Sequence, residues 1–245
     1  MEKIEKPKLM PVLDNLESAV KIWFKNLKKI VLIYLWGLLF AAIPVAIILF
    51  LGLVLNLLGN RASLGLGIAF IIISLAGFLV AIYFSIRAYM SIFLLVKKNY
   101  EGKELEIYKE TKNLFWPYFS LTVLTTIFII LWTFLLIIPG IIYSVFYSFA
   151  VYAFFFEGEK GMAAIRRSIG LVKNYWWEIF GRYFFIGLVF WLFGVVIAAP
   201  LSFVAENSFF FSFWGGVVQA INFLVGPIVL LFSYQIYQDL VKIKK

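Results

Sequence analysis

Six long apolar runs, separated by short charged or Pro- and Gly-containing stretches, constrain this chain more than any other feature. A helix needs about 20 mostly apolar residues to cross the hydrocarbon core of a bilayer. A soluble fold could not hide so much apolar surface, because 64% of the 245 residues are hydrophobic and only 14% are charged. The sequence therefore predicts an all-α, polytopic membrane protein with six transmembrane helices, near residues 30–58, 64–86, 116–138, 141–156, 179–201 and 217–237.

We interpret the whole chain, residues 1–245, as a single transmembrane domain. Residues 1–29 are predicted to form a basic tail and an interfacial helix, residues 30–238 the six-span region, and residues 239–245 a second basic tail. The lysines extend to Lys29, and the apolar run that follows is far longer than the core of a signal peptide. We therefore expect the first span to remain in the mature protein.

The basic residues fall almost entirely on one side of the predicted membrane. Lys and Arg in short loops accumulate on the cytoplasmic side, and 20 of the 22 basic residues lie on the side of the two termini. The exceptions are Arg61, in a connection on the other side, and Arg87, at the inner end of the second run. This distribution predicts a multi-pass protein of the cell membrane with both termini in the cytoplasm.

The same distribution explains the net charge of +9. Basic residues beside a membrane attract anionic lipid headgroups, so we expect membrane lipids as partners. We expect no nucleic-acid binding, because the charges are spread over four juxtamembrane segments and are not gathered into one domain. The sequence names no protein partner.

Three of the basic segments are also amphipathic. In residues 14–30 an apolar face follows helical spacing from Leu16 to Trp23 and beyond, and the lysines lie elsewhere. Residues 161–177 show the same pattern, and residues 104–115 a weaker one. Such helices lie in the membrane interface, where they either steer the chain into the following span or sense or gate lipid. The sequence leaves both interpretations open.

A recurring pattern predicts an internal repeat. Each amphipathic segment is predicted to end in a Lys-Asn pair just before a span, and each returning span ends with a Ser followed four residues later by a Tyr. We predict three copies of an interfacial helix plus a transmembrane hairpin, all inserted in the same sense. The middle copy fits only with a kink or a tilt, because its returning span is short. The Lys-Asn pairs lie at 25–26, 112–113 and 173–174, and the Ser-Tyr pairs are Ser85/Tyr89, Ser148/Tyr152 and Ser233/Tyr237.

The chain contains no His and no Cys. Their absence removes most ways to hold zinc, to build a Ser-His-Asp triad or to shuttle protons near neutral pH. The acidic residues do not fill the gap, because no two carboxylates face each other within a predicted span. We therefore expect no catalytic residues, no metal site and no cofactor, and we do not expect an enzyme.

Polar groups at the inner rim of the predicted membrane form the candidate ligand-binding site. A charge at the depth of Arg87 is costly unless it reaches water, lipid phosphate or a partner. Arg87 therefore either snorkels to the interface or binds an anion or headgroup. If the repeat holds, matched residues of the second and sixth spans meet at one depth as an inward-facing polar ring for a phosphate-bearing amphiphile. The predicted ring consists of Arg87, Ser85, Tyr89, Ser233, Gln235 and Tyr237.

Two further polar pairs lie in or beside the spans. Glu178 and Arg182, four residues apart, are interpreted as an ordinary helix pair at the interface. Gln219 and Asn222, three residues apart in the sixth run, either join helices by hydrogen bonds or line a pathway. The sequence leaves these two alternatives open.

Residues 138–180 carry a recognisable pattern. It consists of Ile-Pro-Gly-Ile-Ile at 138–142, Tyr147-Ser148, Glu157-Gly158, Arg167-Ser168 and Lys-Asn-Tyr-Trp-Trp at 173–177. The pattern resembles the membrane-domain family attached to some glycerophosphoryl diester phosphodiesterases, which also has free-standing, uncharacterised bacterial relatives. The resemblance implies a bacterial-type membrane protein near lipid metabolism, without catalytic residues of its own. The phosphodiesterase domain needs acidic and histidine residues on a soluble barrel, and this chain has no His.

Three functions remain to be compared. We expect a non-enzymatic integral membrane module that scaffolds partners or binds lipid-like molecules. The alternative is a transporter or channel for a small or amphipathic solute, and a membrane-embedded enzyme is disfavoured by the missing polar chemistry. A transporter needs a water-reachable polar path at mid-membrane, whereas a module needs an apolar or closed interior with polar groups at the inner rim.

Overall fold

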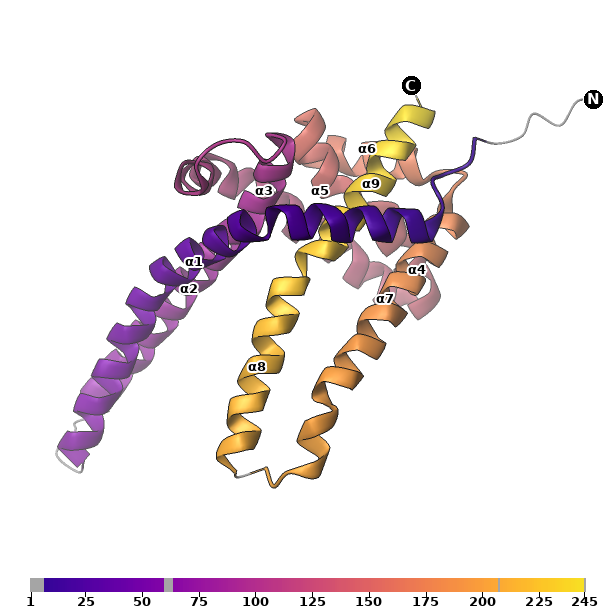
Figure 1. Cartoon of the computed structure of the whole chain (residues 1–245). Helices are drawn as coiled ribbons and strands as arrows, with labels where there is room; N and C mark the ends of the chain where they lie inside the picture. The colour runs from indigo at the N-terminus through magenta and orange to yellow at the C-terminus, as the bar shows by residue number, and fades with distance from the viewer. Residues whose placement is uncertain (1–6, 60–63, 207, 245) are drawn as a thin grey trace, which may run out of the picture. The chain divides into compact units, whose positions relative to one another are not determined.

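The structure is a computed structural model that describes residues 7–59, 64–206 and 208–244 (Figure 1). Arg61, Asn207 and Lys245 lie outside the described residues. Every regular element in the described part of the chain is helical. Six stretches are long and apolar enough to cross a membrane, so the chain is an all-α multi-pass membrane protein. The helices are α1 (Val12–Leu58), α2 (Leu64–Lys97), α3 (Glu104–Leu135), α4 (Ile137–Tyr147), α5 (Ala150–Tyr152), α6 (Met162–Val172), α7 (Trp176–Ala198), α8 (Phe209–Val225) and α9 (Pro227–Ile243).

The first three helices are longer than the predicted spans. α1 and α3 each join an amphipathic segment to the following span without a break, and α2 continues to Lys97. The Lys-Asn pairs of α1 and α3 therefore lie inside helices, and the prediction that the amphipathic segments end there is wrong for these two. The third segment does end as predicted, because Asn174 has a positive φ of 78° and separates α6 from α7.

The chain divides into two compact units, and each is described by itself. Unit 1 comprises residues 1–25 and 117–245, and unit 2 comprises residues 26–116. α1 and α3 each contribute to both units. The single domain predicted for residues 1–245 stays a prediction.

Unit 2 is built on close packing between α1 and α2. A Cβ atom at Gly37 would lie 2.6 Å from the Cβ of Ala88, and one at Gly77 would lie 2.8 Å from the Cδ1 of Ile48. Small residues let two helix backbones approach closely, which is a common way to pair helices where lipid removes the hydrophobic driving force.

In unit 1, α3 and α4 form a tight helical hairpin. The helix is interrupted at Leu136, which has an extended backbone (φ −162°, ψ 141°), and not at Pro139-Gly140 as the sequence predicted. Pro139 lies in the first turn of α4, where a missing N–H costs little. The rings of Trp132 and Tyr143 stack across the hairpin with centroids 4.1 Å apart. Gly140 packs against Thr133, because a Cβ atom there would lie 2.9 Å from the Thr133 Cα.

The short fourth run is interrupted after α4. Phe149 adopts a non-helical conformation (φ −100°, ψ 4°) before α5 and the π-helical turn η2 (Ala153–Glu157). The freed N–H of Phe149 donates to the Ser168 hydroxyl of α6 over 3.0 Å, and that hydroxyl donates to the Phe146 carbonyl over 2.6 Å. A backbone group freed in apolar surroundings needs such a partner. Ser168 thus stabilises the interruption.

The last three helices of the described structure, α7, α8 and α9, belong to unit 1. α7 is followed by the 3-10 turn η3 (Ala199–Phe203), and α8 meets α9 at Gly226. The sixth run begins eight residues earlier than predicted, because Ser208 caps α8 by accepting from the Phe211 N–H over 3.1 Å. In Figure 1, α7 and α8 run in opposite directions, and the first turns of α1 cross α9.

Candidate functional site

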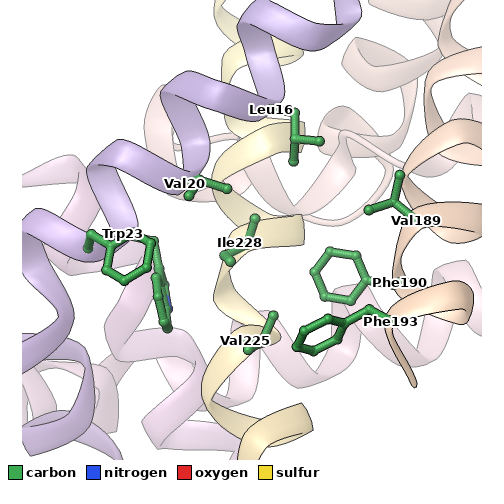
Figure 2. Close-up of a pocket in the computed structure, with 9 residues that line it drawn as sticks. Leu16, Val20, Trp23, Val189, Phe190, Phe193, Val225 and Ile228 are labelled. Atoms are coloured by element: carbon green, nitrogen blue, oxygen red, sulfur yellow. The ribbon is translucent and has the colours of Figure 1, made fainter. Parts of the chain in front are cut away.

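An apolar groove in unit 1 lies between the first turns of α1, the middle of α7 and the junction of α8 with α9 (Figure 2). Its volume is about 340 Å³, which is the lower end of the range for small-molecule sites. Every lining side chain is apolar. They are Leu16, Val20, Trp23 and Phe24 of α1, Val189, Phe190 and Phe193 of α7, Val225 of α8 and Ile228 of α9.

Helical spacing explains why these residues share the groove. Leu16, Val20 and Trp23 repeat every three to four residues, so they lie on one face of the amphipathic start of α1. The indole N–H of Trp23 donates to the Leu224 carbonyl over 3.0 Å, where α8 ends. Since the Trp23 side chain is buried, this bond fixes α1 against the α8–α9 junction.

α1, α7 and α9 each also carry a buried polar residue. Asn15 of α1, Arg182 of α7 and Gln235 of α9 have relative exposures of 0%, 6% and 8%. Arg182 precedes Val189 by seven residues, and Gln235 follows Ile228 by seven residues. Seven residues are about two turns, so each pair lies on one helix face with Cα atoms about 10 Å apart. Because α7 and α9 run in opposite directions, both polar residues lie toward the same end of the groove (Figure 1).

The Gln235 side chain is satisfied by α1. One amide atom lies 2.9 Å from the Ser18 hydroxyl. With the amide oxygen turned toward Ser18, the oxygen also accepts from the Ala19 N–H over 3.2 Å and the nitrogen donates to the Asn15 carbonyl over 3.1 Å. One turn further along α9, an Asp239 carboxylate oxygen accepts from the Met10 N–H over 3.2 Å. These bonds hold the start of α1 across α9.

Two buried donors at this end have no acceptor within the described part of the chain. They are the Nδ2 of Asn15 and the Nη1 of Arg182. Glu178 does not form the predicted helix pair with Arg182, because Glu178 is exposed whereas Arg182 is buried, and the described residues contain no ion pair between them. The interpretation of Arg182 as part of an ordinary surface pair was therefore wrong. We refer to Asn15, Arg182 and Gln235 as the polar end of the groove.

A second polar cluster of unit 1 contains Tyr237. The Arg167 guanidinium donates to both carboxylate oxygens of Glu157, over 2.6 and 3.0 Å, and the Tyr237 hydroxyl donates to the same carboxylate over 2.7 Å. The hydrogen bonds to Glu157 raise the pKa of Arg167 above its ordinary value, so the pair stays charged. This cluster joins η2, α6 and α9.

The Ser-Tyr pairs of the second and third predicted copies also meet in unit 1. Ser148 and Ser233 both interact with the side chain of Tyr183, and the rings of Tyr152 and Tyr237 stack with centroids 5.6 Å apart. The two pairs thus occupy neighbouring positions, as equivalent members of a repeat would. The triplication itself stays a prediction.

The other half of the predicted ring lies in unit 2. Arg87 is only 7% exposed, and its side chain does not point to bulk water as snorkelling required. Its Nε donates to the Thr111 hydroxyl over 2.9 Å, its Nη2 donates to the Tyr108 carbonyl over 2.8 Å, and its guanidinium lies 4.6 Å from the Tyr108 ring centroid. Ser85 donates to the Ala81 carbonyl of its own helix, and Tyr89 is 43% exposed.

The six predicted ring residues are therefore divided between the two units. Arg87, Ser85 and Tyr89 lie in unit 2, whereas Ser233, Gln235 and Tyr237 lie in unit 1. Arg87, Gln235 and Tyr237 each have partners within their own unit. The complete ring stays a prediction.

Sequence reasoning did not single out Asn15, although a signal was present. Asn15, Ala19 and Trp23 follow at intervals of four residues, and all three are buried. A polar residue on the apolar stripe of an amphipathic helix indicates a buried polar contact. The burial of Arg182 had no such local signal, because it depends on α1 and α9, which are distant in the sequence.

Comparison of the chain with protein-family models, with curated proteins and with solved structures finds no match. The resemblance of residues 138–180 to a phosphodiesterase-associated membrane domain therefore stays a prediction.

Proposed function

We propose that this protein is a non-enzymatic membrane module that holds one lipid acyl chain in the groove of unit 1. The observation that carries the proposal is the groove itself, which is about 340 Å³ in volume and has only apolar side chains in its lining. Four helices of a multi-pass membrane protein form it, so the molecules that surround it are lipids. An acyl chain matches both the size and the chemistry of the groove.

The neighbouring part of α1 supports a lipid ligand. The helix that covers the groove is amphipathic, and its exposed face carries Lys21 and Lys25. Such a face lies in the headgroup region and attracts anionic lipids. A lipid in the groove would thus have its tail among apolar side chains and its headgroup near the polar end.

The groove is tested by filling it. Val189 lines the groove, whereas Val196 on the same helix is 71% exposed. We expect Val189→Trp to reduce photolabelling of the groove by a lipid with a photoactivatable acyl chain about tenfold, which corresponds to ~1.4 kcal/mol. The matched variant Val196→Trp should label as the wild type does. Labelled peptides are mapped by mass spectrometry to α1 and α7.

If Val189→Trp and the wild type were labelled equally, the proposal that the groove binds the lipid would be contradicted. Transport would become the leading function if purified protein in sealed vesicles moved a solute and substitution of Gln219 or Asn222 stopped the movement. Both of these side chains are exposed on α8, so neither substitution disturbs a buried core.

The proposal also includes the orientation predicted from the basic residues. A reporter that is active only in the cytoplasm should give signal when fused at Lys103 or at Lys245, and no signal when fused at Asn207. Asn207 and Lys245 lie outside the described residues. Signal at Asn207 would contradict the six-span orientation, because that position follows the fifth span and precedes the sixth.

A further inference from the structure

The apolar groove alone contributes little free energy to lipid binding. A lipid tail leaves one apolar environment for another when it enters an apolar groove inside a bilayer, so the hydrophobic effect contributes almost nothing. Selective binding therefore needs a contact with the part of the lipid that differs from its neighbours. That part is the headgroup, and the polar end of the groove is the place where it would lie.

The polar end contains a cation whose charge is poorly satisfied. Arg182 is 6% exposed, and its Nη1 has no hydrogen-bond partner among the described residues. The carboxylates of Glu178 and Asp239 act on it electrostatically, but neither makes an ion pair with it in the described structure. Asp239 instead accepts from the Met10 N–H. A buried guanidinium without an acceptor is costly, and an anion would remove that cost.

Asn15 adds a second donor without an acceptor. Its side chain is fully buried, and its Nδ2 has no partner among the described residues. Asn15 lies against Gln235, and Arg182 is influenced by Asp239, one turn further along α9. Gln235 and Asp239 lie one turn apart, so both unpaired donors face the same stretch of α9. A group with several acceptor oxygens satisfies two such donors at once.

From these observations we infer that the ligand of the groove is a single-chain amphiphile with an anionic oxygen headgroup, which Arg182 and Asn15 hold at the polar end. The inference rests on the proposed acyl-chain groove and names the chemical class of its ligand. One chain fits the volume of about 340 Å³. A phosphate monoester and a carboxylate share the required chemistry, since each offers charged acceptor oxygens to a planar guanidinium.

The test compares probes that differ only in the headgroup. The full chain in vesicles of zwitterionic lipid is titrated with photoactivatable single-chain probes that carry a phosphate monoester, a carboxylate or a phosphocholine headgroup. We expect an anionic probe to half-saturate labelling of the groove at about tenfold lower concentration than the phosphocholine probe. Preference for the phosphate probe would indicate a phospholipid as the source of the ligand, and preference for the carboxylate probe would indicate a fatty acid.

Arg182→Gln should abolish this headgroup preference, and Arg182→Lys should keep part of it because the charge remains and the planar fork is lost. Arg166→Gln is the matched control, since Arg166 is exposed on α6 and its loss removes the same charge. Asn15→Leu should weaken the preference independently, which keeps the test valid if Arg182→Gln fails to fold. An anionic probe should also raise the unfolding temperature of the wild type. It should not raise the unfolding temperature of a variant that folds but has lost the preference for anionic headgroups.

Three outcomes would overturn the inference. The first is a headgroup preference that persists in both Arg182→Gln and Asn15→Leu. The second combines two results: the wild type shows no headgroup preference, and Asp239→Asn destabilises the protein as much as Arg182→Gln does. Asp239 would then be the partner of Arg182. The third is full competition by inorganic phosphate, because a free anion would then suffice. The groove survives these outcomes if Val189→Trp still blocks labelling by every probe, and it fails if Val189→Trp labels normally.

Discussion

Replacement of Gly140 by alanine is expected to disrupt the α3–α4 hairpin and to cost unit 1 about 3 kcal/mol or more of stability, the upper part of the range for overpacking. A Cβ atom at this position would overlap the Oγ1 of Thr133 and would lie 2.9 Å from its Cα. A flexible side chain could rotate away, but the Cα of a helix cannot move without the helix. The measurement is the unfolding temperature in detergent, together with the fraction of protein that elutes as a single species.

Two variants separate this contact from the general effect of removing a glycine. Gly215→Ala is the matched control in α8, because nothing lies within 4 Å of a Cβ atom there. A helical Gly-to-Ala change without a clash stabilises by about 0.5 to 1 kcal/mol. Combining Thr133→Ala with Gly140→Ala should restore only part of the lost stability, since the contact with the Cα remains. Equal unfolding temperatures for Gly140→Ala and Gly215→Ala would contradict the close approach.

Replacement of Arg87 by methionine is expected to destabilise unit 2 by about 3 kcal/mol. Arg87 donates charged hydrogen bonds to Thr111 and Tyr108, and such bonds contribute about 1.5 to 3 kcal/mol each. Its guanidinium also lies over the rings of Tyr83 and Tyr108, which adds about 0.5 to 2 kcal/mol. Methionine keeps much of the apolar volume and removes these contacts. Unfolding in denaturant measures the loss.

Arg87→Lys and Arg166→Met complete this experiment. Lysine keeps the charge but lacks the planar guanidinium, which donates to Thr111 and Tyr108 and also lies over the Tyr108 ring. We therefore expect Arg87→Lys to retain less than half of the stability that Arg87→Met loses. Arg166 is exposed, and its replacement should leave stability unchanged within about 0.5 kcal/mol. If Arg87→Met retained full stability but lost association with anionic lipid, the headgroup interpretation of Arg87 would be supported, and its role in joining α2 to α3 would be rejected.

The sequence predicted the features that depend on local composition. The lengths and hydropathies of the apolar runs predicted the six spans. The spacing of Leu16, Val20 and Trp23 predicted that they share one helix face, and all three line the groove. The sequence missed features that depend on contacts between distant segments. The hairpin turns at Leu136 because Gly140 fits against Thr133, and no property of Leu136 itself predicts this. Helix ends were also misplaced where, as at Asn26 and Asn113, no residue forces the backbone out of the helix.

The candidate site shows the same limit. Tyr237 was predicted as a site residue because Ser-Tyr pairs recur, and Gln235 because it matches Arg87 in the predicted repeat. The structure places both in polar contacts of unit 1. Asn15 and Arg182 were not predicted, because their importance arises from donors that lack acceptors once α1, α7 and α9 have packed together. A local pattern can identify a polar residue on an apolar face, but it cannot show whether folding leaves that residue satisfied.

The Trp23 contact has a consequence for biosynthesis. The helix that carries Trp23 leaves the ribosome well before α8, whose Leu224 carbonyl it binds. Until α8 emerges, the indole N–H of Trp23 lacks this acceptor. The groove therefore forms late in synthesis, because Val225 of α8 and Ile228 of α9 complete its lining, and a ribosome that stalls before α8 releases a chain with membrane-spanning helices but no complete groove.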